Sequence, residues 1–249
     1  MLTIALIGPD GSGKTTVSNR LKSELGLPVT SIYMGVNMHA GGVMLPHMRL
    51  ALALRRILRG DDPEAGSDIE TPRLPPTTVP RRALASMRSG LRLASWLMEE
   101  SCRLWVARRH TRRGRVVIFD RHFFVDFFAA DIRADGSPRP LARRIHGFML
   151  QHVFPKPDLA ICLDAPAEVL YARKPEGTLE RVQRKREESL AALNALPRCL
   201  VVDATRPPDE VVSEIATIIR SLYERRLQER RSDESFLARA LAPIRGRWS

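Results

Sequence analysis

One short segment near the start of the chain constrains the fold more than any other. Its residues, Gly8–Thr15, read GPDGSGKT and match the pattern G-x-x-x-x-G-K-[ST]. The apolar run Leu2–Ile7 precedes it, as in a buried parallel strand, and an amphipathic helical pattern follows from about Thr15 to Leu25. A glycine-rich turn between a strand and a helix lets backbone N–H groups surround phosphate oxygens at the positive end of the helix dipole. We therefore expect a phosphate-binding loop.

The polar residues of this loop have the chemistry that a bound nucleotide needs. Lys14 is expected to reach the β- and γ-phosphates of a nucleoside triphosphate, and the hydroxyl of Thr15 to bind Mg²⁺. ATP and Mg²⁺ are therefore the predicted cofactors. The residues predicted to contact the phosphates of ATP are Gly8, Asp10, Gly11, Ser12, Gly13, Lys14, Thr15 and Thr16.

Five apolar runs alternate with helical patterns along the chain. The runs are Leu2–Ile7, Pro28–Met34, Arg115–Asp120, Pro157–Asp164 and Cys199–Asp203. The later helical patterns cover Arg82–Arg113, Glu168–Leu193 and Pro208–Arg226. This alternation predicts an α/β fold in three layers, with a five-stranded parallel sheet covered by helices on both faces.

The length of 249 residues favours one α/β domain with an insertion over two full domains. We expect the domain to span 1–226, with the insertion at 35–82 and a basic, loosely attached C-terminal tail at 227–249. Within the insertion, Val43–Leu58 has a helical pattern that suits a cover over a substrate pocket or, alternatively, a membrane-surface helix. Gly60–Pro80 is rich in Pro, Asp, Glu and Thr, which indicates a loop.

The composition limits the kinds of binding partner and indicates the cellular compartment of the protein. The net charge of +12 suits anionic ligands, a class that includes nucleotides, nucleic acids and acidic membrane surfaces. Cys102, Cys162 and Cys199 lie far apart, which is typical of a reducing compartment, and we expect the last two to pack as small hydrophobic residues in strands. The chain shows no secretory signal pattern and no apolar stretch near the roughly 20 residues that cross a bilayer. A cytoplasmic location is expected, and the sequence leaves monomer and homodimer both open.

Charged residues follow the third apolar run. Asp120 ends this run, where a carboxylate can orient Mg²⁺ or its water shell beside the phosphates, and Arg121 comes next. Strand ends in open parallel sheets face the ligand crevice, which favours a functional role over an exposed surface pair.

A dense basic stretch begins at Arg173 and continues to about residue 187. Phosphoryl transfer depends on cations that stabilise the charge on the moving γ-phosphoryl group, and a lid after the fourth strand would supply them. A solvated helix face is the alternative interpretation. The predicted catalytic residues are thus Lys14, Asp120 and Arg173, and the other cations of the stretch are Lys174, Arg181, Arg184, Lys185 and Arg186.

Three of these motifs together resemble the thymidylate kinase-like branch of the nucleoside monophosphate kinases, within the P-loop NTPases. They are GPDGSGKTT at Gly8–Thr16, the triplet Asp120-Arg121-His122 and the basic stretch from Arg173, in the order that the family has them. The resemblance implies a sheet in the order 2-3-1-4-5, with ATP over the glycine loop and a small-molecule acceptor in the opposite crevice. It also implies an ATP-dependent kinase.

The resemblance further implies roles for single residues. Asp10 would contact the sugar of the acceptor, Arg121 would hold the acceptor phosphate, and Arg173 would be the first lid arginine. The loop at 204–207, which contains Arg206, would lie against the adenine of ATP.

The acceptor side of the chain departs from the family pattern. After the second predicted strand the chain reads Ile32-Tyr33-Met34-Gly35-Val36, where thymidylate kinases carry Arg-Glu-Pro-Gly. After Asp-Arg it reads His122-Phe123-Phe124-Val125-Asp126-Phe127 in place of the Ser…Ala-Tyr-Gln pattern that reads thymine. The insertion at 35–82 has no counterpart in the family. We therefore expect a kinase that is not specific for dTMP.

Asp126 bears on the chemistry of the acceptor. A phosphate acceptor is already an anionic nucleophile, whereas an alcohol gains from a carboxylate that takes its proton. Asp10 and Asp126 are the candidates for such a base, and both are predicted to contact the acceptor; a capping or pairing role within its helix is the alternative for Asp126. A nucleoside monophosphate is the expected acceptor, and a hydroxyl of a sugar, a nucleoside or a lipid-linked group is the alternative.

Other function classes fit the sequence less well. A guanine-nucleotide switch normally carries Asn-Lys-x-Asp, which this chain lacks. A nucleic-acid-binding ATPase would suit the net charge, but no RNP motif or zinc finger is present, so no obligatory nucleic-acid partner is expected. The histidines show no metal-ligand spacing, and His146 and His152 fall on different helical faces. We expect packing or surface roles for them.

Overall fold

A computed structural model describes residues 2–35, 79–133 and 139–245 of the chain, with side chains omitted for 79–88 and 233–245. The predicted helix at Val43–Leu58 and all but the last two residues of the predicted loop at Gly60–Pro80 lie outside these ranges. The last residues of the predicted insertion, 79–82, belong to a long helix described below.

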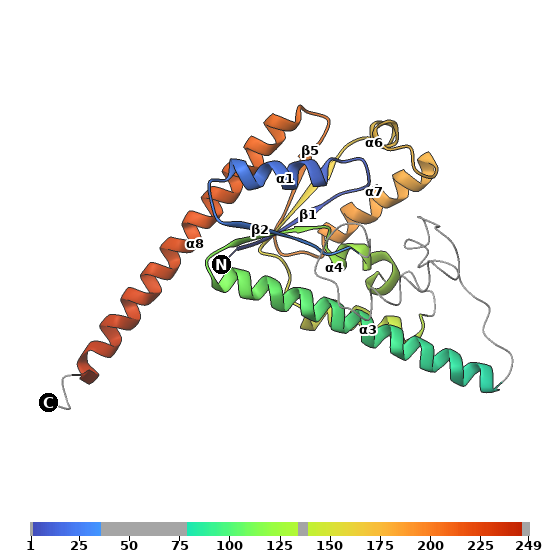
Figure 1. The fold of residues 1–249 in the computed structure, drawn as a ribbon, viewed down its shortest axis with the longest axis horizontal. Helices are drawn as coiled ribbons and strands as arrows, with labels where there is room; N and C mark the ends of the chain where they lie inside the picture. The colour runs from blue at the N-terminus through green and yellow to red at the C-terminus, as the bar shows by residue number, and fades with distance from the viewer. Residues whose placement is uncertain (1, 36–78, 134–138, 246–249) are drawn as a thin grey trace.

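The five predicted strands are all present and form one parallel sheet (Figure 1). Their order is β2-β3-β1-β4-β5, as expected. The strands are β1 (Leu2–Ile7), β2 (Val29–Tyr33), β3 (Val116–Asp120), β4 (Leu159–Asp164) and β5 (Cys199–Asp203). The predicted fold class and strand order are therefore confirmed.

Helices cover both faces of this sheet (Figure 1). The helices are α1 (Lys14–Glu24), α3 (Val79–Arg112), α4 (Phe123–Asp126), α5 (Leu141–Phe148), α6 (Ala167–Arg173), α7 (Leu179–Leu193) and α8 (Pro208–Arg245). Two short π-helical segments, η2 (Phe128–Ile132) and η3 (Met149–Val153), follow α4 and α5. Among the described residues, none of the helices is both long enough and apolar enough to cross a membrane.

The core lies in two layers because side chains of the strands alternate between the faces. Along β1, Leu2, Ile4 and Leu6 pack on the side of α1, α6 and α8, whereas Ala5 and Ile7 pack on the other side. That second side is covered by α3, α4, η3 and α7. It includes the buried residues Ala107, Phe123, Phe124, Leu150 and Leu193.

The register of the sheet brings the carboxyl ends of the central strands together. Leu6 of β1 lies opposite Asp120 of β3, and Ile7 lies opposite Cys162 of β4. The glycine loop begins directly after Ile7. Asp120 and Asp164, the last residues of β3 and β4, therefore end on either side of that loop.

Two predicted helix boundaries are wrong. The pattern over Glu168–Leu193 forms two helices, α6 and α7, because Pro175 has no N–H to donate and Gly177 has a φ of +76°. The last helix does not stop at Arg226 but continues to Arg245, so the predicted tail begins inside α8. The chain has no Gly or Pro between Arg226 and Pro243 to end it.

The two strand cysteines differ in environment. Cys162 on β4 is fully buried, as expected, and this burial raises the pKa of its thiol to about 12. Cys199 is exposed, so the prediction that it packs in the core is wrong. The reason is that β5 is an edge strand, where even Val201 is 52% exposed.

Candidate active site

The loop after β1 follows a backbone path that only glycine permits at two positions. Gly8 has a φ of +141°, and a Cβ there would lie 2.4 Å from the carbonyl oxygen of Leu163. Gly11 has a φ of +84°, and a Cβ there would lie 2.6 Å from the carbonyl oxygen of Leu170. Side chains at these positions would be strained and would collide with backbone. The glycines therefore let the loop lie directly against β4 and α6.

The junction of this loop with α1 offers hydrogen-bond donors without protein acceptors. Gly13, the N-cap residue of α1, is in the left-handed conformation and has no side chain that could accept hydrogen bonds from the first N–H groups of the helix. The buried hydroxyl oxygen of Ser12 has no hydrogen-bond partner among the described residues. Free N–H groups at a helix N-terminus bind anions, and a phosphate group would satisfy both sets of donors. The geometry of the loop therefore fits a phosphate.

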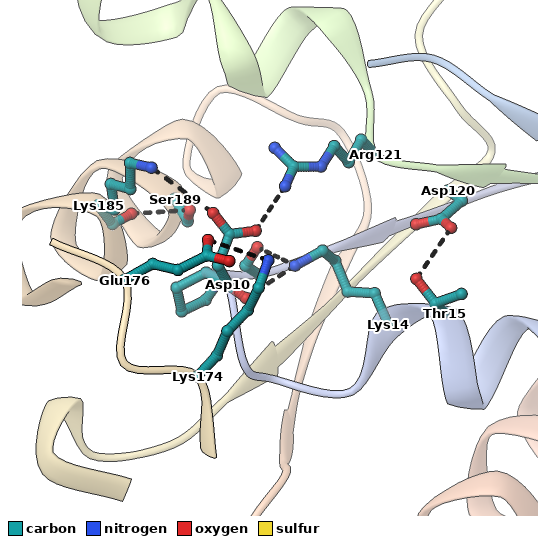
Figure 2. A network of polar contacts seen from close by, with 11 residues as sticks. Asp10, Lys14, Thr15, Asp120, Arg121, Lys174, Glu176, Lys185 and Ser189 are labelled. Atoms are coloured by element: carbon teal, nitrogen blue, oxygen red, sulfur yellow. Dashed lines mark hydrogen bonds and ion pairs between the residues drawn. The ribbon is translucent and has the colours of Figure 1, made fainter. Parts of the chain in front are cut away.

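Lys14 extends its side chain back across the loop (Figure 2). Its ammonium donates hydrogen bonds of 2.8 Å and 2.7 Å to the carbonyl oxygens of Gly8 and Pro9. Burial, reinforced by the positive charge of Arg121, lowers the pKa of Lys14 to about 8, although Asp10 acts in the opposite direction. A buried ammonium with a lowered pKa gains most from an additional anion nearby.

Asp10 is the carboxylate on which the cations of the site converge (Figure 2). Its side chain accepts a hydrogen bond from Arg121, and Lys185 lies 3.5 Å from its second oxygen. Desolvation raises the pKa of Asp10, but the charges of Arg121, Lys14, Lys185 and Lys174 outweigh it and the net shift is downward. Asp10 is therefore ionised, and four cations from separate parts of the chain surround it.

Arg121 owes its position to an unusual backbone conformation. Its φ is +65°, and it is the one residue other than glycine with a positive φ in the described part of the chain. The left-handed conformation costs a non-glycine residue of the order of 1–3 kcal/mol, and such strain is concentrated at functional sites. Desolvation opposes the charged form of Arg121, but the carboxylates of Asp126 and Asp10 raise its pKa overall. The strained turn after β3 thus places a permanent cation beside the glycine loop.

Thr15 and Asp120 provide two oxygen groups side by side. The hydroxyl of Thr15 donates to Oδ2 of Asp120 over 3.4 Å. Mg²⁺ in phosphate-transfer sites is held by one or two protein oxygens together with waters and substrate phosphates, so this pair fits such an ion. No group of three or more acidic, His or Cys side chains has a metal-binding arrangement within the described ranges, but Mg²⁺ shared with phosphates does not require one. Thr16 follows on the exposed surface of α1.

Asp126 lies at the end of the single-turn helix α4. Buried His122 begins this helix, and its Nδ1 accepts a 3.2 Å hydrogen bond from the backbone N–H of Phe124. Burial lowers the pKa of His122 to about 3, so the ring is neutral. Desolvation raises the pKa of Asp126, and the positive charges of Arg121 and Lys14 only partly offset this effect. Although the side chain of Asp126 is accessible to solvent, the protein atoms around it still disfavour its negative charge, and it acts electrostatically on the same cations as Asp10.

The basic stretch divides into two groups with different partners. Lys185 approaches Asp10, and Lys174 pairs with Glu176 at 3.1 Å while contributing to the field at Asp10. Arg173 instead donates a 2.8 Å hydrogen bond to the carbonyl oxygen of Ala204. In this structure the predicted lid arginine therefore lies at the turn after β5, and two lysines lie nearer the loop carboxylate.

Other predicted members of the site also pair away from the loop. Arg186 forms two 2.7 Å hydrogen bonds to the carboxylate of Asp164. Arg206 pairs with Glu214 of α8, and its Nε lies 3.4 Å from the carbonyl oxygen of Asp203. The turn that carries Arg206 is fastened to β4, because the backbone N–H of Ala204 donates to the Asp164 carbonyl at 2.8 Å.

Lys185 had a signal in the sequence that could have singled it out. It follows the apolar Val182 by three positions on α7, and Val182 is buried. Residues three apart share a helix face, so Lys185 points toward the body of the protein whereas Arg184 is exposed.

A buried cluster of ionisable groups supports the helices next to the site. His146 of α5 is fully buried, with its Nδ1 2.6 Å from Asp131 and its Nε2 3.1 Å from Glu100. Burial opposes protonation, but the hydrogen bonds to these carboxylates raise the pKa of His146 to about 9. Its ring also meets Phe127 edge-on at 4.8 Å, directly after Asp126. The packing role expected for the histidines is thus, at His146, a charged link among α3, η2 and α5.

Together these features define a three-layer α/β protein with a glycine loop at the carboxyl edge of its sheet, and the geometry of this loop fits a bound phosphate. A comparison with protein-family models found no match, and a comparison with curated proteins also found none.

Proposed function

We propose that this protein is an ATP-dependent small-molecule kinase of the thymidylate kinase-like type, which transfers the γ-phosphoryl group to a nucleoside monophosphate. The observation that carries the proposal is the loop at Gly8–Thr15. It combines glycines whose positive φ angles let the loop lie close to β4 and α6, a helix start without a side-chain cap, and a buried lysine whose ammonium donates to loop carbonyls. These are the features that a polyphosphate would complete.

Each side chain has a role in this proposal. Lys14 exchanges its hydrogen bonds to loop carbonyls for the phosphates of ATP, and Lys174 and Lys185 stabilise the charge on the transferred group. Thr15 and Asp120 would hold Mg²⁺, which neutralises phosphate charge when bound. Arg173 remains the candidate lid arginine, a role that requires it to leave the Ala204 carbonyl.

Arg121 and Asp10 are the proposed acceptor-binding pair. Arg121 is a cation at the carboxyl edge of the sheet, where it suits the phosphate of a nucleoside monophosphate. Asp10 suits hydroxyl groups of the acceptor's sugar. Because the thymine-reading pattern of thymidylate kinases is missing from the chain, we propose an acceptor other than dTMP alone.

The environment of Asp126 favours one alternative, transfer to a hydroxyl group of a non-nucleotide metabolite. A carboxylate with a raised pKa holds a proton more strongly and is a better general base. An alcohol acceptor requires such a base, whereas a phosphate acceptor does not.

Initial rates of ADP release over a panel of nucleoside monophosphates and alcohols test the proposal. We expect turnover with at least one nucleoside monophosphate and its loss in Lys14→Ala. Lys22→Ala changes an exposed lysine of the same helix and serves as the matched control. Turnover with alcohols alone would replace the first acceptor by the alternative, and no ADP release with any acceptor would refute the kinase proposal.

A further inference from the structure

Helix α3 carries large apolar side chains on the side that faces solvent. Leu91 is 67% exposed, Met98 is 51% exposed and Trp105 is 61% exposed. These residues are seven positions apart, so they lie in one row that extends about 21 Å along the helix. The buried side of α3 is formed by other residues, such as Ala107 at 2% exposure. The apolar row is therefore not part of the protein core.

Arginines surround the C-terminal end of this row. Arg108, Arg109, Arg112 and Arg113 join Trp105 around a surface hollow of about 350 Å³. The guanidinium of Arg109 lies 5.7 Å from the centre of the Trp105 ring. Cation–π contacts of this kind hold both groups at the surface in a defined arrangement.

Negative charge is missing from the exposed surface of the same stretch. Between Ser89 and Arg115 the acidic residues are Glu99 and Glu100, which are only 6% and 5% exposed. Glu99 forms a salt bridge of 2.8 Å with Arg103, and Glu100 contacts His146. We call the exposed side chains of Leu91, Met98, Trp105, Arg108, Arg109, Arg112 and Arg113 the outer face of α3.

We propose that the outer face of α3 docks on an anionic lipid surface. Helices at membrane interfaces combine apolar side chains and tryptophan with arginine or lysine, and cations near the surface are attracted to acidic headgroups. A nucleic acid would use the arginines and Trp105 but would leave Leu91 and Met98 without an apolar partner. The charge of the outer face and its apolar row together favour lipid. The inference is independent of the proposed kinase activity.

The outer face of α3 shares no residue with the candidate active site. The glycine loop leads into α1, and α1 and α3 cover opposite faces of the sheet (Figure 1). Docking through α3 therefore tethers the protein without using any residue placed in the candidate active site.

Co-sedimentation of the full chain with lipid vesicles tests the docking proposal. The vesicles contain phosphatidylcholine alone or an equimolar mixture of phosphatidylcholine and phosphatidylserine. We expect binding to the mixed vesicles, little binding to the neutral ones, and weakening on added salt. A failure to sediment with the mixed vesicles overturns the proposal.

Matched variants separate the outer face from the overall charge. Arg109→Glu with Arg112→Glu should weaken binding to the mixed vesicles by at least about tenfold. Arg20→Glu with Lys22→Glu makes the same charge change on exposed α1 and should have a clearly smaller effect. Equal losses in the two variants would show attraction by net charge alone and would overturn the assignment to α3.

The apolar row is tested separately. Met98→Ser with Trp105→Ser should also reduce vesicle binding, and a blue shift of tryptophan emission on binding should disappear in Trp105→Phe. Circular dichroism and an unchanged thermal midpoint would show that these surface variants remain folded. If the variants lose self-association or binding to labelled DNA or RNA instead of vesicle binding, the outer face has a protein or nucleic-acid partner and the lipid proposal is wrong.

Discussion

Arg121 and Asp10 are 111 residues apart in the chain, yet they form an ion pair at the carboxyl edge of the sheet. The pair links the glycine loop to the turn after β3, and Arg121 reaches it from a left-handed backbone conformation. The anion that Arg121 contacts in this structure is a protein carboxylate. An acceptor phosphate would compete for the same guanidinium.

Two substitutions at Arg121 distinguish the effect of its backbone strain from the role of its guanidinium. Arg121→Gly suits the positive φ but removes the guanidinium, so it should raise KM for the acceptor by about tenfold or more while stability changes little. Arg121→Ala should impair acceptor use equally and also lower stability by about 1 kcal/mol relative to Arg121→Gly. Steady-state kinetics and urea unfolding measure the two effects. Wild-type KM in both variants would remove Arg121 from the acceptor site.

Either Arg173 or the lysines near Asp10 could supply the positive charge of the lid, and substitutions distinguish the two possibilities. Arg173→Ala should lower kcat by roughly 10²–10³ if this arginine leaves the Ala204 carbonyl during turnover. Lys185→Ala should lower kcat as well, because Lys185 already lies 3.5 Å from Asp10. Arg184→Ala is the control, since it removes an exposed cation from the same helix. A wild-type kcat in Arg173→Ala alone would assign the lid charge to the lysines.

The raised pKa of Asp126 predicts a pH dependence for an alcohol acceptor. The carboxylate must be ionised to take a proton, so kcat should fall as the pH is lowered through a pKa above the ordinary 3.8 of aspartate. Asp126→Asn should lower kcat and remove this limb of the pH profile. With a nucleoside monophosphate acceptor the same variant should retain most of its activity. An unchanged profile in Asp126→Asn would exclude Asp126 as the base.

The His146 cluster predicts the response of stability to substitution. His146→Gln removes the cation that contacts both buried carboxylates, Asp131 and Glu100, although Arg143 still lies 3.7 Å from Asp131, and it should cost about 3 kcal/mol in the free energy of unfolding. His152→Gln, at an exposed position six residues later, should have almost no effect. Urea unfolding near neutral pH compares the two. Equal stabilities would mean that the cluster contributes little.

The same cluster predicts how stability changes with pH. The folded pKa of His146 is about 9, above its ordinary value of 6.5, so its stabilisation is complete below pH 6.5 and is lost as the pH rises toward about 9. Thermal midpoints of the wild type should fall over this interval. His146→Gln should show a flatter curve, and parallel curves for the two proteins would contradict the charged state assigned to His146.

Local sequence patterns were sufficient to predict the strands of the sheet and the position of the glycine loop. The strands at Leu2–Ile7 and Cys199–Asp203 have the predicted bounds, because apolar runs end at polar or glycine residues. The helix α8 extends beyond Arg226, where the basic composition predicts a loosely attached tail, because no Gly or Pro interrupts the chain before Pro243. The exposure of Cys199 could not be predicted from its apolar run, since that run does not reveal which strand is at the edge.

The contacts at the site that the sequence does not predict join residues that are far apart in the chain. His146 meets Glu100 46 residues away, and only the packing of α5 on α3 brings them together. Arg173 looked like the lid cation from its place in the basic stretch, but Pro175 and Gly177 end α6 and direct the chain so that Lys185 approaches Asp10. Such choices among neighbouring cations depend on helix orientation rather than on composition.

Calorimetric titration of the folded protein with ATP and Mg²⁺ tests the central claim most directly. We expect the wild type to bind, and Lys14→Ala to bind at least about tenfold more weakly while its circular dichroism spectrum is retained. Lys22→Ala should match the wild type. If the folded wild-type protein binds no nucleoside triphosphate in the presence of Mg²⁺, the glycine loop is not a nucleotide site and the account is wrong.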